Sequence, residues 1–310
     1  MKKIEGLIAA AFTPLHADGS INREMIPEVV DKLLADGIKG IFVCGSNGEG
    51  PNMTSSERMQ VAEDFVKAAN GRVLTIVHVG HSSIEEAKLL AAHAATIGAD
   101  AFSSVAAFYF RPSSVQNLAD CMAEIATGAP NLPFYYYHIP HLTGISMDML
   151  QFLEIAGPLI PNLAGIKYTA STIHEFQACR AYQNKRYDIL FGLDELLLPA
   201  LAVGAKGAIG STYTFAAPVY QKTIEYFNSG DITAAQKNHE QIIQIVRLLL
   251  KYPPIPAQKA IMKMLGWDFG PCRLPLQNLS EDDYKKFQSE LIKIPLFNHL
   301  PAREKEEYRK

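Results

Sequence analysis

The sequence predicts an α/β protein built as one (β/α)8 TIM barrel with a C-terminal helical extension. Its 310 residues are an ordinary length for a single barrel of eight β/α units. Eight short apolar segments alternate with amphipathic ones, and this order requires parallel strands. The alternative is an open doubly wound sheet. Such a sheet favours a P-loop or a glycine-rich dinucleotide motif after an early strand, and the sequence has neither.

The eight predicted strands are rich in β-branched and aromatic residues, and most are bounded by glycine or proline. They span residues 6–14, 40–45, 73–80, 99–106, 133–139, 163–169, 188–193 and 207–213.

The segments between the strands carry helical periodicity and helix-end signals. Residues 54–57 (Thr-Ser-Ser-Glu) and 82–85 (Ser-Ser-Ile-Glu) match the capping-box pattern, and Gly71 and Gly98 follow the two helices. The first helix is expected to stop at Gly37. Its apolar face consists of Met25, Ile26, Val29, Val30, Leu33 and Leu34.

The eight units end near Ala216. We therefore expect residues 1–216 to form the catalytic barrel and residues 217–310 to form a helical extension of the same domain. A proline-rich segment at 252–256 is expected to interrupt the extension, and the charged residues 301–310 to fray. Helices are predicted there at 219–227, 232–251, 257–265 and 282–292.

Composition excludes several classes of function. Hydrophobic residues make up 48% and charged residues 20%, as in proteins with a large core. A formal charge of −3 without a basic stripe argues against nucleic acid as a partner. No apolar run is long enough to span a membrane, and the start lacks a signal-peptide core. The four scattered cysteines indicate reduced thiols in the cytoplasm.

Lys167 is the most informative residue at the strand ends, where barrel active sites lie. It belongs to an apolar segment, and lysine is uncommon in buried strands. Side-chain alternation puts Lys167 and Thr169 on the interior face and Ile166 and Tyr168 on the helix-facing side. A desolvated amine is more often neutral and can attack a carbonyl carbon. The alternative is a structural lysine that reaches solvent.

Two neighbouring strand ends complete a possible site. Tyr137 ends the fifth strand and can relay a proton, whereas Tyr135 and Tyr136 are expected to pack as an aromatic belt. The Gly-Ser-Asn-Gly turn at 45–48 can point backbone N–H groups and a hydroxyl at a carboxylate. The sequence thus favours an enzyme that forms a Schiff base with a 2-oxo acid and breaks or makes a carbon–carbon bond.

These strand ends resemble those of the N-acetylneuraminate lyase and dihydrodipicolinate synthase family of class I aldolases. The resemblance extends from residue 6 to about residue 276. Within the family, residues 132–140, 191–195 and 273–276 are most similar to the sialic acid lyases. The segments that carry the family resemblance are Gly-Ser-Asn-Gly-Glu at 45–49, Tyr-His-Ile-Pro at 137–140, Gly-Ile-Lys-Tyr-Thr at 165–169 and Gly-Ser-Thr-Tyr at 210–213.

The resemblance implies cleavage of N-acetylneuraminate to N-acetylmannosamine and pyruvate by a cytoplasmic homotetramer, with no cofactor and no metal. By position, Lys167 matches the imine-forming lysine and Tyr137 the proton-shuttling tyrosine. Ser46 and Asn47 match the pair that hold the pyruvate carboxylate, with Ser46 also in the catalytic group. Tyr109 aligns with a catalytic tyrosine that reaches into a neighbouring subunit's site. The residues matching sugar-binding positions are Thr169, Gly192, Asp194, Glu195 and Ser211.

Departures from the family pattern concern the substrate. Asn47 stands where threonine is usual, and Ala106-Ala107 precede Phe108 where proline is common. Leu142 stands where dihydrodipicolinate synthases carry an arginine. The alternatives within the family are an aldolase for a 2-keto-3-deoxy sugar acid and dihydrodipicolinate synthase itself.

Three rival interpretations lie outside the family. A metal-dependent enzyme would use His78 with His81 or His138 with His141, but residues three apart on a strand point to opposite faces. A non-catalytic 2-oxo acid sensor would not need the lysine and tyrosine. Cys44 as a nucleophile is less favoured than a small buried thiol before a glycine turn.

Overall fold

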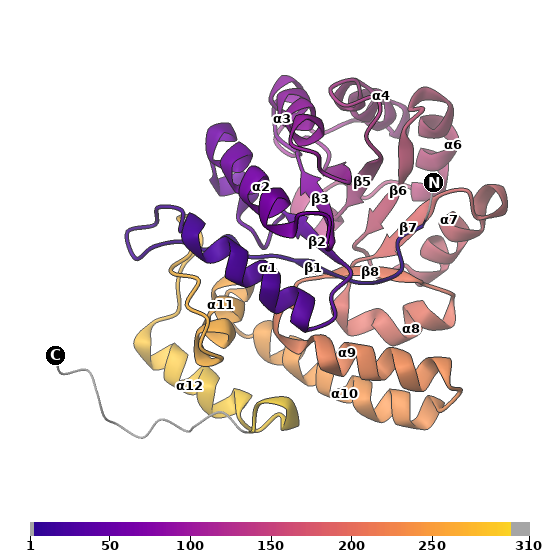
Figure 1. Ribbon diagram of the computed structural model, residues 1–310. Helices are drawn as coiled ribbons and strands as arrows, with labels where there is room; N and C mark the ends of the chain where they lie inside the picture. Colours follow the sequence, from indigo (N-terminus) through magenta and orange to yellow (C-terminus); the bar gives the residue numbers. More distant parts are fainter. Residues whose placement is uncertain (1–2, 299–310) are drawn as a thin grey trace.

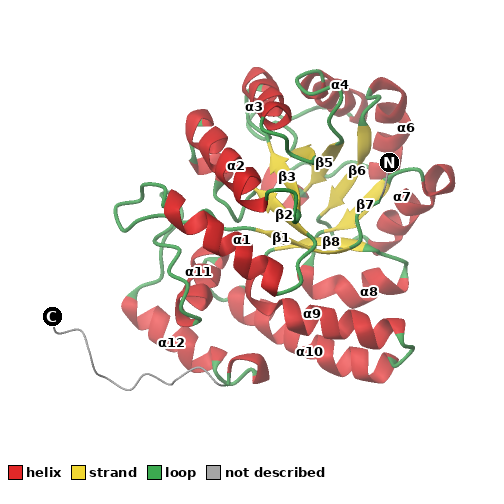
Figure 2. Ribbon diagram, viewed as in Figure 1, coloured by secondary structure: helices red, strands yellow, loops and turns green. Residues whose placement is uncertain are grey.

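The computed structural model describes residues 3–298 and shows a closed barrel of parallel strands in the order β1 to β8, with helices around it (Figures 1 and 2). Each strand lies within its predicted range, so the predicted fold class is confirmed. The strands are β1 Gly6–Ala10, β2 Gly40–Val43, β3 Leu74–His78, β4 Ala101–Ser104, β5 Phe134–His138, β6 Leu163–Tyr168, β7 Asp188–Phe191 and β8 Gly207–Gly210.

Helices follow the strands around the barrel, and the last ones pack beside it (Figure 1). They are α1 Ile26–Ala35, α2 Ser55–Ala69, α3 Ile84–Thr96, α4 Val115–Ala126, α5 Pro140–Thr143, α6 Met149–Leu159, α7 Ile173–Lys185, α8 Leu197–Ala202, α9 Tyr213–Asn228, α10 Ile232–Leu249, α11 Pro254–Met264 and α12 Glu281–Leu291. Short 3-10 turns occur at Arg23–Met25, Gly50–Asn52, Asp194–Leu196 and Pro295–Phe297.

Two apolar layers follow from the alternation of side chains along the strands. One fills the barrel interior and includes Phe42, Tyr135 and Tyr137. The other lies between the strands and the helices and includes Ile166 and Tyr168. The predicted orientation of β6 is therefore confirmed, since its apolar pair packs outward and leaves Lys167 on the inner face.

Helix starts follow the predicted capping chemistry with one correction. Thr54 and Glu57 form the predicted reciprocal capping box at α2. At α3 the N-cap is Ser83, not Ser82, and its hydroxyl accepts a hydrogen bond from the backbone N–H of Glu86. The Glu86 carboxylate instead accepts a 2.5 Å hydrogen bond from the Ser55 hydroxyl, so α2 and α3 are tied together there.

Among the C-terminal helices, α10 begins at Ile232 as predicted, whereas α9 and α11 begin earlier than predicted. α9 begins at Tyr213 instead of residue 219, so the predicted boundary at residue 216 lies inside this helix. α11 begins at Pro254, because proline is tolerated in the first turn of a helix, where its missing N–H would have no partner. The break between α10 and α11 therefore covers residues 250–253 instead of the predicted 252–256. The segment 301–310 lies outside the described residues.

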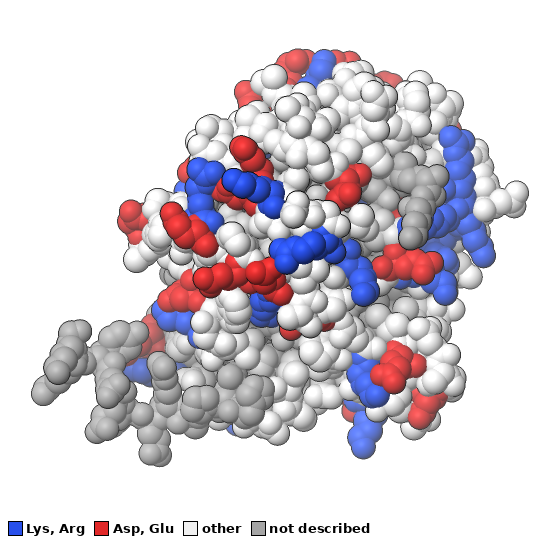
Figure 3. All heavy atoms as spheres, viewed as in Figure 1, with Lys and Arg blue, Asp and Glu red and all other residues white. Residues whose placement is uncertain are grey.

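The molecular surface is mixed in charge. Acidic and basic side chains are interspersed over most of the face in Figure 3. Within residues 3–298, no helix combines the length and hydrophobicity that a membrane span requires.

Candidate active site

The parallel register of β5 and β6 places Tyr137 directly beside Lys167. The Lys167 side chain is 3% exposed, and its Nζ lies 3.8 Å from the centre of the Tyr137 ring and 3.9 Å from that of Phe42. Both rings belong to the apolar cluster inside the barrel. The lysine thus occupies an apolar cage near the carboxyl ends of the strands, as its position in β6 predicts.

Burial in this cage changes the protonation of the amine. Desolvation lowers the pKa of Lys167 from 10.5 to about 7, and the charge of Asp194 opposes this shift. Near neutral pH a substantial fraction of the side chain is therefore the neutral amine, which is the nucleophilic form. The structure supports a reactive Lys167 over a lysine that reaches solvent.

The Tyr137 phenol stays protonated in the same environment. Burial raises its pKa from 10.0 to about 12, while the nearby hydroxyls of Ser46 and Thr169 oppose the rise. Tyr135 and Tyr136 serve packing, as expected. The Tyr135 hydroxyl donates to Asp188 at 3.0 Å, and Tyr136 packs on the Phe152 ring at 4.7 Å between centroids. Of the three tyrosines in β5, Tyr137 is the one placed to exchange protons beside Lys167.

The turn after β2 brings Ser46 to this site but directs the Asn47 amide elsewhere. Asn47 is 8% exposed, and its Nδ2 donates to the Ala10 carbonyl at 3.3 Å and to Gln258 at 3.5 Å. Both amide hydrogens are therefore committed within the protein. The Ser46 hydroxyl, in contrast, lies beside the Tyr137 phenol.

Asp194 and Ser211 lie together at the ends of β7 and β8. The Asp194 carboxylate accepts hydrogen bonds from the Ser211 hydroxyl at 3.2 Å and from the backbone N–H and hydroxyl of Thr212 at 2.9 and 2.8 Å. Burial nevertheless raises its pKa to about 6, and these bonds oppose the rise. Asp194 also acts electrostatically on Lys167 and Tyr137, so it belongs to the same site.

Gly192 and Thr169 fit against each other. A Cβ atom on residue 192 would lie 2.1 Å from the Thr169 Oγ1, so only glycine leaves room for that hydroxyl. The Thr169 Oγ1 is buried, and the group it acts on is the Tyr137 phenol, with no further hydrogen-bond partner among the described residues. Its remaining hydrogen-bonding capacity is open to a ligand.

Two predicted site residues lie away from the group around Lys167: Glu195 at its margin and Tyr109 outside it. Glu195 is partly exposed beside Asp194 and acts electrostatically on His141. Tyr109 is 77% exposed, and its ring packs edge-on against Phe110 at 5.0 Å. Across residues 3–298, no hydrogen bond or ring contact joins Tyr109 to the other predicted site residues.

Two residues of the site escaped the sequence-based prediction. Phe42 is one of the two rings that contact the Lys167 Nζ. Side-chain alternation along β2 would have placed it in the barrel interior. Thr212 holds Asp194, but it follows the end of β8 by two residues, where strand alternation no longer applies.

His78, His81 and Cys44 make separate local contacts. The His78 Nδ1 lies 3.1 Å from the Cys44 carbonyl oxygen, whereas His81 accepts from the backbone N–H of Ser83. Burial raises the pKa of the Cys44 thiol to about 11, which makes it a poor nucleophile. Among the described residues, no group of three or more His, Cys, Asp or Glu side chains is arranged to hold a metal ion.

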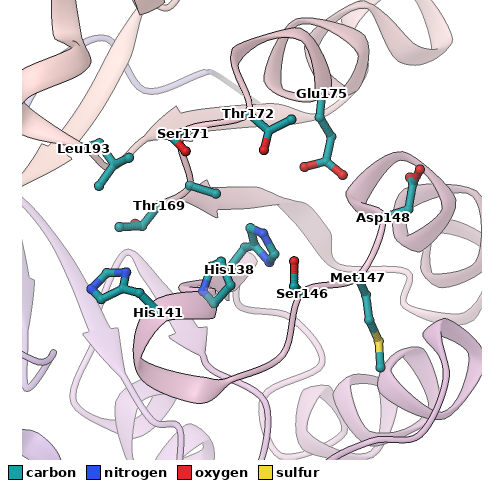
Figure 4. Close-up of a pocket in the computed structure, with 12 residues that line it drawn as sticks. His138, His141, Ser146, Met147, Asp148, Thr169, Ser171, Thr172, Glu175 and Leu193 are labelled. Carbon is teal, nitrogen blue, oxygen red and sulfur yellow. The ribbon is translucent and has the colours of Figure 1, made fainter.

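A pocket of about 510 Å³ opens beside the site, and Figure 4 shows its lining. Thr169 and Leu193 belong to it, so it adjoins the strand that carries Lys167. His138 lies in its wall with an unpartnered, buried Nδ1, and burial lowers its pKa to about 4, so the imidazole is neutral. Asp148 and Glu175 add acidic groups. The lining is mostly polar and contains no lysine or arginine.

The fold and the site together place the chain among barrel enzymes of the Schiff-base aldolase class. The chain belongs to the dihydrodipicolinate synthetase family, which matches residues 3–294.

Nearly the whole chain is similar to N-acetylneuraminate lyases and to a dihydrodipicolinate synthase. An N-acetylneuraminate lyase of Sus scrofa is 40% identical over 287 residues, covering 91% of this chain and 90% of the relative. The structure of Proteus mirabilis N-acetylneuraminate lyase has a TM-score of 0.92 at 39% identity, covering 95% of this chain and 100% of the other. A dihydrodipicolinate synthase of Bacillus anthracis has a TM-score of 0.90 at 27% identity, with coverages of 95% and 100%.

Proposed function

We propose that this protein cleaves N-acetylneuraminate to N-acetylmannosamine and pyruvate through a Schiff base on Lys167. The observation that carries the proposal is the desolvated Lys167 amine beside the Tyr137 phenol. Similarity to N-acetylneuraminate lyases over nearly the whole chain supports the choice of substrate. Pyruvate release, assayed with N-acetylneuraminate and a panel of 2-keto-3-deoxy sugar acids, tests it. A preference for a member of the panel would replace the substrate and keep the Schiff base.

In this proposal Lys167 forms the covalent bond to the substrate and Tyr137 transfers the protons. The neutral Lys167 amine adds to the C2 carbonyl of the open-chain sugar acid, and the Tyr137 phenol protonates the oxygen that leaves as water. The resulting phenolate takes the proton of the C4 hydroxyl as the C3–C4 bond breaks, which releases the aldehyde sugar and leaves an enamine. The phenol returns that proton to C3, and water hydrolyses the pyruvate imine.

Leu142 distinguishes this activity from dihydrodipicolinate synthesis. An arginine at this position would pair with the carboxylate of aspartate semialdehyde through two parallel hydrogen bonds, which leucine cannot supply. The structure places Leu142 on α5 with 60% exposure, and the Arg111 guanidinium lies against nearby Gly144. We expect pyruvate release from N-acetylneuraminate and little condensation of pyruvate with aspartate semialdehyde. Preference for the semialdehyde in direct competition would contradict this, with Arg111 as the first residue to examine.

The Leu142→Arg variant should lower kcat/KM for N-acetylneuraminate by no more than about tenfold, because Leu142 is 60% exposed and an arginine there stays largely solvated beside the pocket residues Pro140 and His141. Leu89→Arg is the matched control, since Leu89 is similarly exposed at 56% but lies on α3. Equal losses in the two variants would mean that the added charge acts through general stability.

Asp194 and Glu195 are expected to select the sugar tail, because carboxylates accept hydrogen bonds from vicinal hydroxyls. Asp194→Asn and Glu195→Gln should each raise KM for N-acetylneuraminate, by roughly tenfold per lost hydrogen bond. Inhibition by pyruvate, which has no tail, should stay as in the wild type for Glu195→Gln, and for Asp194→Asn it should do so well above pH 7, where Lys167 is neutral with or without the charge of Asp194. A parallel loss of pyruvate inhibition would show that these carboxylates act on the reaction centre instead.

We also propose a homotetramer located in the cytoplasm, in which Tyr109 enters a neighbouring subunit's site. The exposed aromatic side chains of Phe108, Tyr109 and Phe110 support an interface at the end of β4. Residues 217–310 are proposed to belong to the same domain as the barrel, since Lys259 of α11 is buried against Glu49 of the β2 turn.

A further inference from the structure

The turn that presents Ser46 has a strained backbone. Two non-glycine residues, Cys44 and Glu49, bracket it with left-handed φ angles of 58° and 54°, which a Cβ atom disfavours. The turn closes on itself through hydrogen bonds from Gly50 N to the Gly45 carbonyl at 3.0 Å and from Glu49 N to the Ser46 carbonyl at 3.1 Å. Such a conformation persists only where surrounding contacts determine it.

The turn is held partly by the barrel, where the Thr13 hydroxyl donates to the Gly48 carbonyl at 2.7 Å, and partly by the C-terminal extension, 210 residues beyond Glu49. The Glu49 carboxylate is held at both oxygens, by the Lys259 Nζ at 2.7 Å and by the backbone N–H of Arg273 at 2.8 Å. Lys259 also donates to the Pro271 carbonyl at 3.0 Å. Glu49 is 3% exposed and Lys259 5% exposed. The strained residue is therefore anchored by a buried, hydrogen-bonded ion pair.

Two further contacts connect the same parts of the chain. The Arg273 guanidinium makes two hydrogen bonds to Glu57, at 2.9 and 2.7 Å, at the start of the helix that follows the turn. Gln258, next to Lys259, accepts from the Asn47 amide at 3.5 Å. The turn and the helix start after it are thus both tied to the extension.

We propose that Glu49 and Lys259 form a positioning pair that holds the β2 turn in the shape that receives the substrate carboxylate. Neither side chain touches the reacting atoms. Buried ion pairs seldom add stability over a well-packed apolar pair, but they fix one geometry, because each charge requires its partner. The C-terminal extension thereby becomes part of 2-oxo acid recognition. This inference rests on the proposed role of Ser46 and the turn N–H groups in binding pyruvate.

The test uses the whole protein and pyruvate as the probe. Lys259→Met leaves a buried charge on Glu49 and risks misfolding, so the deciding variant is Glu49→Gln/Lys259→Met, which removes both charges. In this double variant the pyruvate concentration for half-maximal borohydride trapping should rise about tenfold, the size of one lost hydrogen bond. Trapping at saturating pyruvate should reach the wild-type level, because Lys167 is unchanged.

Lys263→Met provides the matched control, since Lys263 lies on the same helix but pairs with Asp268 at the exposed surface. It should trap pyruvate as the wild type does. A folded double variant with wild-type half-saturation would overturn the positioning role, whatever its melting temperature. The Ser46→Ala variant separates carboxylate binding by the turn from positioning of the turn by Glu49 and Lys259. If it weakens pyruvate binding while the double variant does not, only the positioning role fails. If Ser46→Ala has no effect, the Ser46 hydroxyl does not bind the carboxylate, and the double variant alone decides whether the pair positions the backbone N–H groups of the turn.

Discussion

The Lys167→Ala variant should lose lyase activity by at least about four orders of magnitude and should form no borohydride-stable adduct with pyruvate. The reason is that the amine supplies the covalent bond to the substrate. Of the lysines in residues 3–298, only Lys167 and Lys259 are buried, and Lys259 is engaged by Glu49. No second buried amine is therefore available to replace it. Pyruvate release and mass spectrometry of the trapped protein measure both effects.

Two controls separate loss of chemistry from loss of fold. The variant should remain folded, because removal of a desolvated amine from an apolar cage offsets part of the cost of the cavity that alanine leaves. In the wild type, the trapping rate should rise with pH up to about 7 and then level off, since the pKa of Lys167 is lowered to about 7 and the neutral amine predominates above it. A folded variant that still labels would transfer the role to another residue.

The Tyr137→Phe variant should lower kcat on the order of 10²–10⁴-fold with a modest change in pyruvate binding, because it removes a proton relay and keeps the ring. The ring also forms part of the cage, at 3.8 Å from the Lys167 Nζ, and phenylalanine preserves that contact. Ser46→Ala should cause a smaller loss, since it removes one hydroxyl that acts on the phenol or the carboxylate. Steady-state kinetics and pyruvate inhibition separate the two effects.

Tyr136→Phe is the matched control on the same strand. Tyr136 points to the outer layer and packs on Phe152, away from Lys167. Its loss of a hydroxyl should leave kcat close to that of the wild type. If Tyr137→Phe also kept near-normal kcat, the proton would have to travel through another residue or a water.

Local patterns predicted the barrel and the inward direction of Lys167. Alternation along β6 was sufficient, because Ile166 and Tyr168 require the outer apolar layer and leave Lys167 no other face. Adjacent parallel strands then bring Tyr137 beside it.

What could not be predicted depends on contacts between distant parts of the chain. At α3 the local pattern allowed two caps, since Ser82 and Ser83 each have a glutamate three residues later, and the structure uses Ser83 while Glu86 bonds to Ser55 on another helix. The Asn47 amide turns toward Gln258, which is 211 residues away. No local pattern in the β2 turn indicates that Lys259 compensates the charge of Glu49. Such pairings arise from packing of the extension against the barrel.

Borohydride reduction during turnover of N-acetylneuraminate tests the central claim most directly. The wild-type protein is mixed with N-acetylneuraminate alone, reduced and digested, and the modified peptide is sequenced by mass spectrometry. We expect one adduct with the mass of a reduced pyruvate imine, located on Lys167, with N-acetylmannosamine in the supernatant. An adduct on any other lysine, or release of N-acetylmannosamine and pyruvate without any adduct, would contradict the account.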